Sequence, residues 1–155
     1  MKLSINKAEK IKRKKLQELI SLNNIRKINN LGGINIIEER DNSFEGRCED
    51  YVFTEVKNEP WSSTLTYSNA IILMPIEFLA QRDYNLIESP NDGDIVAYIL
   101  KRINKIPFIS HWGIFENGKV RSRFGCGNVY RHNLNMVPSE YGNEIIFFRK
   151  STKQP

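Results

Sequence analysis

The sequence predicts an α+β domain, with N-terminal helices packed on a C-terminal antiparallel β-sheet. Up to about residue 87, apolar residues recur mostly at helical spacings. From residue 94 onward, the chain breaks into short β-branched or aromatic segments that turn residues separate. A length of 155 residues fits one globular domain, which we divide into a basic helical segment over 1–30 and an α+β domain over 31–151.

The first helix is expected over residues 6–22, with Asn6 or Ser4 as its N-cap. Its apolar stripe consists of Ala8, Ile11, Leu16, Leu19 and Ile20. The following asparagines and the Gly32-Gly33 pair favour turns and end the helical pattern. The stretch "INIIEERDNSFEG" is predicted to be irregular.

Two further helical segments are expected before the sheet. "CEDYVFTEV" has Tyr51, Val52 and Val56 on one helical side and should end before Pro60, which blocks continuation of a helix. "AIILMPIEFLAQRDYNLI" is predicted to be a helix that Pro75 breaks or kinks.

Five segments have the pattern of strands: "DIVAYIL", "FISHWGIF", "KVRSRF", "NVYRHNL" and "EIIFFRK". Asn117-Gly118 predicts a type I′ turn between the second and third of them, so Phe115 should pair with Val120. Alternation then assigns one face of this hairpin to His111, Gly113, Phe115, Val120, Ser122 and Phe124. We expect the bare position at Gly113 to let a substrate backbone or a facing helix approach His111.

The positive charge is concentrated at the start of the chain. Seven basic side chains and one acidic side chain in residues 1–15 give +6; since the whole chain carries +5, the remaining 140 residues carry −1. One interpretation is contact with an anionic surface through Lys10, Lys12, Arg13, Lys14 and Lys15. The other, which we favour, is a solvated helix face packed on the domain through Leu16, Leu19 and Ile20, because no aromatic residue accompanies the charges.

No apolar run reaches the roughly 18 residues of a membrane helix, and the basic start lacks the apolar stretch of a secretory signal. We therefore expect cytoplasmic synthesis with reduced thiols, a single Cys48–Cys126 bridge being the minor alternative. Delivery elsewhere would use a phage or secretion machinery. The oligomeric state cannot be read from the sequence.

Cys48 and His111 are the candidate catalytic residues. A cysteine nucleophile needs a base, and a helix N-terminus lowers the pKa of its thiol. Cys48 begins a predicted helix and His111 lies on the inward face of a predicted hairpin. Taken separately, a cysteine or a histidine on an apolar face is more often an inert core residue.

The order of these features resembles the NlpC/P60 superfamily of papain-like cysteine peptidases and amidases. The resemblance rests on Cys48 at a helix start followed by Tyr51-Val52, on Pro90, Gly93 and Asp94 matching "PxxGD" before a strand, and on the histidine of "SHWGIF". It covers roughly residues 44–125. Arg47 and Glu49-Asp50 depart from the Asp and Ser-Gly that usually flank the family's cysteine.

The resemblance implies a thiol hydrolase that cleaves an amide bond, in a cell-wall peptide or in the target of a toxin or effector. Cys48 would be the nucleophile, His111 the base, and Ser122 the third residue that orients the imidazole. The alternative is a non-catalytic interaction module of the same fold, which uses the basic helix or the cleft to bind a partner.

No cofactor or metal is expected. A zinc site would need Cys48, Cys126, His111 and His132, but no two of these have a short ligand spacing. Cys126 lies in a glycine-flanked turn without a helix behind it, so we interpret it as structural.

Overall fold

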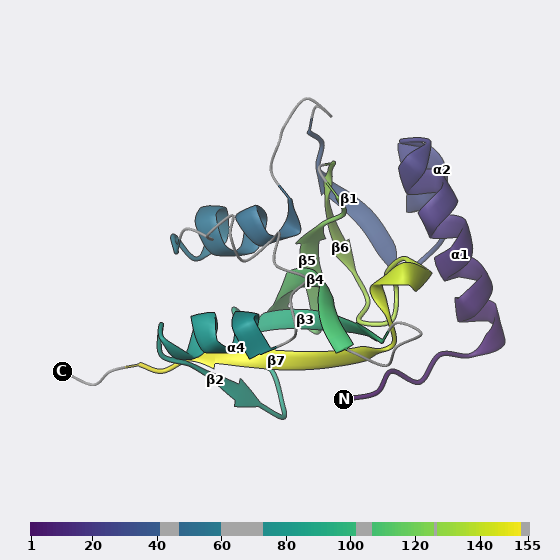
Figure 1. Cartoon of the computed structure of the whole chain (residues 1–155). Helices are drawn as coiled ribbons and strands as arrows, with labels where there is room; N and C mark the ends of the chain where they lie inside the picture. The colour runs from purple at the N-terminus through teal and green to yellow at the C-terminus, as the bar shows by residue number, and fades with distance from the viewer. Residues whose placement is uncertain (41–46, 60–72, 102–106, 126, 153–155) are drawn as a thin grey trace.

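The computed structural model describes residues 1–40, 47–59, 73–101, 107–125 and 127–152. It confirms the predicted α+β class with an antiparallel sheet (Figure 1). The seven strands lie in the order β1-β6-β5-β4-β3-β7-β2. Their bounds are Ile34–Glu38 (β1), Tyr84–Ile87 (β2), Ile95–Lys101 (β3), Pro107–Glu116 (β4), Lys119–Arg123 (β5), Val129–His132 (β6) and Glu144–Lys150 (β7).

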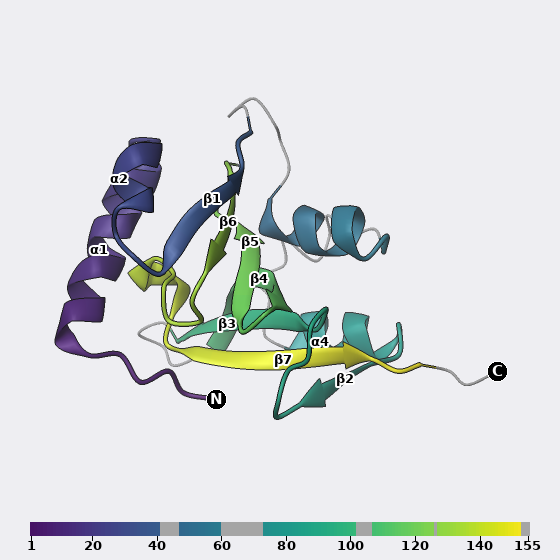
Figure 2. The same cartoon turned by 180° about the vertical axis from the view of Figure 1, so that it is seen from behind.

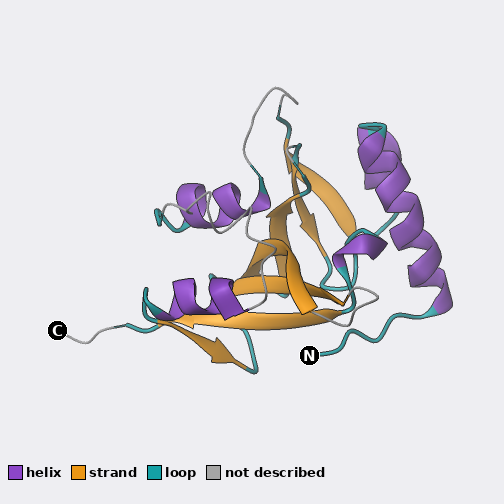
Figure 3. Cartoon of the chain, in the orientation of Figure 1, coloured by secondary structure: helices purple, strands orange, loops and turns teal. Residues whose placement is uncertain are grey.

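Helices cover both faces of this sheet. On one side lie α1 (Lys7–Ser21), α2 (Ile25–Asn29) and the short 3-10 helix η2 (Ser139–Tyr141). On the other lie the π-helix η1 (Asp50–Val56) and α4 (Leu73–Ala80), as the reverse view in Figure 2 and the secondary-structure colouring in Figure 3 show. The sheet therefore separates the basic first helix from the helix that begins with Cys48.

Two apolar clusters follow from this arrangement. The first joins Leu16, Leu19 and Ile28 of the N-terminal helices to one face of the sheet, which includes Val96 and Tyr98. The second packs η1 and α4 on the opposite face and contains Cys48, Tyr51, Val52, Phe53, Phe78, Leu79, Ile95, Ala97, Trp112 and Ile114. Strand alternation produces the division, since neighbouring residues such as Val96 and Ala97 point to opposite faces.

The N-terminal helix forms as predicted. Asn6 caps α1 by accepting from the Glu9 amide, and the Glu9 side chain accepts from the Asn6 amide, which completes a capping box. Leu16 and Leu19 bury the expected stripe, but Ile11 is left exposed.

Arg13 corrects the predicted basic surface. Its side chain is buried and its guanidinium donates to the carbonyls of Val137, Pro138 and Gly142 and to the Asn143 side chain, at 2.7–3.2 Å. Because its side chain is buried and its guanidinium is occupied by these acceptors, Arg13 is unavailable to an external anion. It ties α1 to the segment that carries η2.

The central hairpin has the predicted register. Phe115 pairs with Val120 and Glu116 with Lys119 around Asn117-Gly118, and both turn residues have positive φ. The prediction for Gly113 was wrong. A Cβ there would lie 2.4 Å from Cγ1 of Val120, so the space beside this glycine belongs to the neighbouring strand and not to a substrate.

Two strands were missed in the sequence. Residues 34–38, predicted to be irregular, form β1, which pairs with β6 at the sheet edge. Residues 84–87, predicted to be helical, form β2 at the opposite edge, because α4 already ends at Ala80 and Asp83 reverses the chain with φ +61°. Both are short edge strands, whose sequence pattern is weak.

Candidate functional site

Cys48 lies at the start of a helix, as predicted. The helical turn at residues 48–49 continues directly into η1. The Asp50 carboxylate accepts a 2.8 Å hydrogen bond from the Arg47 amide, which closes the first turn. The acidic residue after Cys48 that departs from the family pattern thus has a local structural role.

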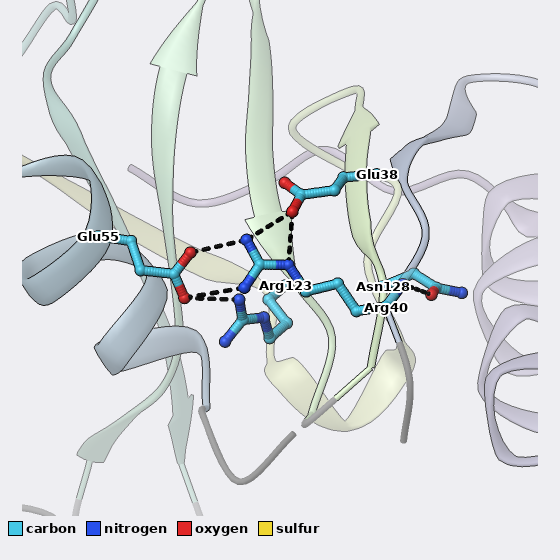
Figure 4. A network of polar contacts seen from close by, with 5 residues as sticks. All are labelled: Glu38, Arg40, Glu55, Arg123 and Asn128. Carbon is cyan, nitrogen blue, oxygen red and sulfur yellow. Dashed lines mark hydrogen bonds and ion pairs between the residues drawn. The ribbon is translucent and has the colours of Figure 1, made fainter. Parts of the chain in front are cut away.

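A polar network fixes this helix against the sheet (Figure 4). Glu55 of η1 accepts from Arg40 at 2.8 and 3.2 Å and from the buried Arg123 of β5 at 2.7 Å. Arg40 also pairs with Glu38 and, through its amide, with Asn128. Burial raises the pKa of Glu55, but the hydrogen bonds from both arginines outweigh it, so the pKa is lowered and the carboxylate stays charged.

The thiol of Cys48 is buried and protonated. It donates to the Glu49 carboxylate at 3.3 Å, while the backbone amides of Trp112 and Glu49 donate to the sulfur. Burial and the negative charge of Glu49 raise the pKa of Cys48 well above its usual value, and the two amides only partly oppose this. The expectation of a partly ionised thiol near neutral pH is therefore wrong for this state of the site.

His111 is fully buried on β4, on the predicted face. Its ring stacks on Tyr141 with centroids 4.4 Å apart and planes 11° apart, and it packs against Phe124 and Tyr98. Neither ring nitrogen has a hydrogen-bond partner in the described structure. Burial, with the nearby His132, lowers the pKa of His111 well below its usual value, so the imidazole is neutral.

Tyr141 stacks on the imidazole of His111 and lies within electrostatic range of the thiol. The residue closes η2, and its carbonyl accepts from Ser110, which sits at a bulge in β4 one residue before His111. Its hydroxyl accepts from the Gly125 amide, and the charge of an ionised Cys48 would act on it. A side chain at the next residue, Gly142, would put its Cβ 2.0 Å from the Ile99 carbonyl oxygen, so the backbone here fits tightly against β3.

Ser122 does not orient His111. Its hydroxyl lies 2.8 Å from Nε2 of His132, whose Nδ1 lies 2.9 Å from the Asn133 carbonyl. Because a carbonyl only accepts, Nδ1 of His132 carries the proton and Nε2 accepts from Ser122. The third catalytic residue predicted from the sequence therefore belongs to a different histidine.

The sulfur of Cys48 contacts the backbone next to His111, but the thiol and the imidazole are not hydrogen-bonded. The sulfur accepts from the amide of Trp112, the residue that follows His111, while strand alternation points the two side chains of His111 and Trp112 to opposite faces. With both imidazole nitrogens unpartnered, the predicted thiol–imidazole hydrogen bond is absent. Cys126 lies outside the described residues.

Three residues of this site were missed in the sequence. Tyr141 is 30 positions from His111, and only the folded η2 brings it onto the imidazole. The bulge at Ser110 could not be predicted, because the alternation of residues in the sequence does not indicate where a strand bulges. Glu49 accepts the thiol hydrogen of Cys48, a contact that its place in the sequence does not indicate.

Groups of three or more potential metal-ligating residues are absent from the part of the chain that the structure describes. Within the same residues, no helix combines the length and the apolar character that crossing a membrane requires. Comparison of the chain with protein-family models, curated proteins and solved structures finds no match.

Proposed function

We propose that this protein is a thiol hydrolase that cleaves an amide bond, with Cys48 as nucleophile and His111 as base, on a papain-like plan that resembles the NlpC/P60 superfamily. The observation that carries the proposal is a fully buried imidazole whose nitrogens have no hydrogen bond in the described structure, next in the chain to Trp112, whose amide donates to the sulfur of Cys48 at a helix start. A buried polar group without a partner costs about 1–3 kcal/mol, and such costs concentrate at functional sites.

The surroundings of the sulfur support a nucleophilic role. Two backbone amides and the start of a helix stabilise negative charge at Cys48. What keeps the proton on the thiol is burial and the Glu49 carboxylate, which is half-exposed and lies at the surface of the site. Displacing this carboxylate from the sulfur removes one of the two contributions that raise the thiol pKa.

The reaction then follows the usual steps of a cysteine hydrolase. His111 takes the thiol proton as sulfur attacks the carbonyl carbon, and it returns that proton to the leaving amine as the C–N bond breaks. Water, deprotonated by the same imidazole, hydrolyses the thioester and regenerates the thiol. The Cys48 amide, in the first helical turn, is an available donor to the oxyanion.

This cycle requires the two side chains to meet. Because the imidazole and Trp112, which packs with Cys48, point to opposite faces of β4, the start of η1 must shift for a thiol–imidazole hydrogen bond to replace the thiol–carboxylate one. The protonated state described above is then the resting enzyme. The family resemblance makes cell-wall peptide amides the first substrates to assay, and protein targets of an effector the second.

Alkylation kinetics test the proposal. In a Cys126→Ser background, the rate of iodoacetamide modification of Cys48 is followed from pH 6 to pH 9 with mapping of the labelled peptide. Glu49→Gln should raise the rate at pH 6 several-fold because it removes a charge that opposes ionisation, and His111→Ala should lower it about tenfold or more. Glu140→Gln, a glutamate of η2, is the matched control for charge.

Two results would overturn the proposal. One is an alkylation rate at pH 6 that is the same in the His111→Ala variant as in its parent. The other is modification of Cys48 only above pH 9 in every variant, since a thiol that never ionises near neutral pH cannot be the nucleophile. Either would favour the non-catalytic interaction module.

A further inference from the structure

The outward side of α1 combines positive charge with exposed aliphatic side chains. At 100° per residue, one ridge lies opposite the buried Leu16 and Arg13. This outer ridge consists of Lys7, Ile11, Lys14, Lys15, Glu18 and Leu22. Ile11 is 63% exposed and Leu22, the C-cap residue, is 74% exposed. They are separated by three turns, so both side chains point the same way, roughly 16 Å apart.

The outer ridge is not the side of α1 that packs on the domain. The opposite side of α1 is fully engaged: Leu16 is 0% and Leu19 3% exposed, and Arg13 makes four hydrogen bonds to the segment before β7. The helix is therefore anchored to the domain through its inner side, and Figure 1 shows it along one edge of the molecule.

The charges near the ridge are mostly uncompensated. The exposed cations of the two N-terminal helices are Lys7, Lys10, Lys12, Lys14, Lys15, Arg26 and Lys27. Of the two acids, Glu18 pairs with Lys15 at 3.1 Å, and Glu9 is turned toward Asn6 and Asn135. Apart from the pair of Lys15 with Glu18, the cations of these helices therefore give the surface a positive excess.

We propose that the outer ridge binds an anionic lipid surface, with α1 lying in the interface plane. Lysines supply attraction to the headgroups, and Ile11 and Leu22 insert between them, as in interfacial helices. A second copy of the chain is disfavoured because two such ridges would repel each other. Nucleic acid is disfavoured because the ridge offers aliphatic side chains and no aromatic ring on which a base could stack.

Vesicle sedimentation of the full chain tests this. Vesicles containing about 40% phosphatidylglycerol in phosphatidylcholine should bind the protein, and vesicles of phosphatidylcholine alone should not. Ile11→Ser with Leu22→Ser should weaken binding about tenfold at roughly 0.1 M salt, and Lys7→Gln with Lys14→Gln should do the same. These side chains are exposed, so the variants should fold.

Matched variants elsewhere control for composition and net charge. Leu86→Ser, which removes another exposed aliphatic side chain, and Lys101→Gln with Lys119→Gln should leave vesicle binding within twofold of the parent. Equal losses in these controls would overturn the proposal, since binding would then follow net charge alone. So would absence of vesicle binding, whether or not the protein binds duplex or single-stranded nucleic acid. Concentration-dependent dimerisation that Ile11→Ser abolishes would overturn it too.

Discussion

Two fully buried histidines, His111 and His132, lie on nearby strands and differ in one respect. Both rings pack against Phe124 and Tyr98, and burial lowers the pKa of both. His132 has a partner at each nitrogen, Ser122 and Asn133, whereas His111 has a partner at neither. In similar surroundings, the ring nitrogens of His132 are therefore hydrogen-bonded and those of His111 are not.

The difference separates a structural histidine from a candidate functional one. A satisfied buried ring stabilises the fold, while an unpartnered ring costs free energy that an apolar residue would not cost. Stability alone gives no reason for a histidine at position 111. The comparison yields four predictions, ordered by their expected effect on the free energy of unfolding.

Replacing His132 should cost the most. His132→Leu leaves the buried Ser122 hydroxyl without its acceptor, at roughly 2 kcal/mol, and removes the partly buried hydrogen bond to the Asn133 carbonyl, at roughly 1 kcal/mol, so about 3 kcal/mol in total. Urea unfolding monitored by circular dichroism measures the change. His111→Leu is the matched variant and should cost far less. Similar losses in the two variants would remove the distinction between the histidines.

Acid should destabilise the protein through the buried rings. The pKa of His132 falls from its usual 6.5 to about 4, mainly through burial. Between these values the unfolded chain binds more protons than the folded one, so stability decreases as the pH falls from about 6.5 toward 4. This lowering of the His132 pKa corresponds to about 3 kcal/mol of stability. His111 acts in the same direction.

The pH profile of the variants checks this assignment. Unfolding free energies of the parent and of His132→Leu, measured from pH 7.5 to 4, should converge as the pH falls, because the variant lacks one of the titrating groups. Curves that stay parallel would show that His132 does not carry this pH dependence.

Ser122→Ala should have a smaller effect. It removes one hydrogen bond and leaves Nε2 of His132 without a donor, at a cost of about 1–2 kcal/mol. Because Ser122 contacts His132 and not His111, the alkylation rate of Cys48 should stay within twofold of the parent. A tenfold slower alkylation would restore Ser122 to the catalytic role that the sequence suggested.

The hairpin and the helix start were predictable because their signals are local. Asn117-Gly118 determines the turn, strand alternation then sets the face of His111, and Cys48 begins a helix with the apolar side Tyr51-Val52. The edge strands were harder, since a strand such as β1 is recognised by pairing with β6, which lies more than 90 residues away.

The polar partners of the site could not be read from the sequence. Ser122 shares a hairpin face with His111, yet its hydroxyl bonds to a residue of β6 on its other side. Each inner strand has two neighbours, and alternation indicates the face of a side chain but not the strand to which it bonds. Arg13 likewise looked like part of a basic surface, because the buried carbonyls that it satisfies come together only when α1 packs.

The smallest expected change in stability comes from His111→Phe, and this variant is the most direct test of His111 as the catalytic base. Phenylalanine preserves a ring against Tyr141 and Phe124 and removes two unpartnered nitrogens, so the gain from losing buried polar atoms should offset the cost of the larger ring. We expect the free energy of unfolding to change by less than about 1 kcal/mol, while alkylation of Cys48 at pH 6 slows about tenfold. Denaturant unfolding and mass-spectrometric labelling on the same samples measure both quantities. A loss of more than about 3 kcal/mol with unchanged alkylation would mean that His111 serves the fold, as His132 does, and that its unpartnered nitrogens have no catalytic meaning.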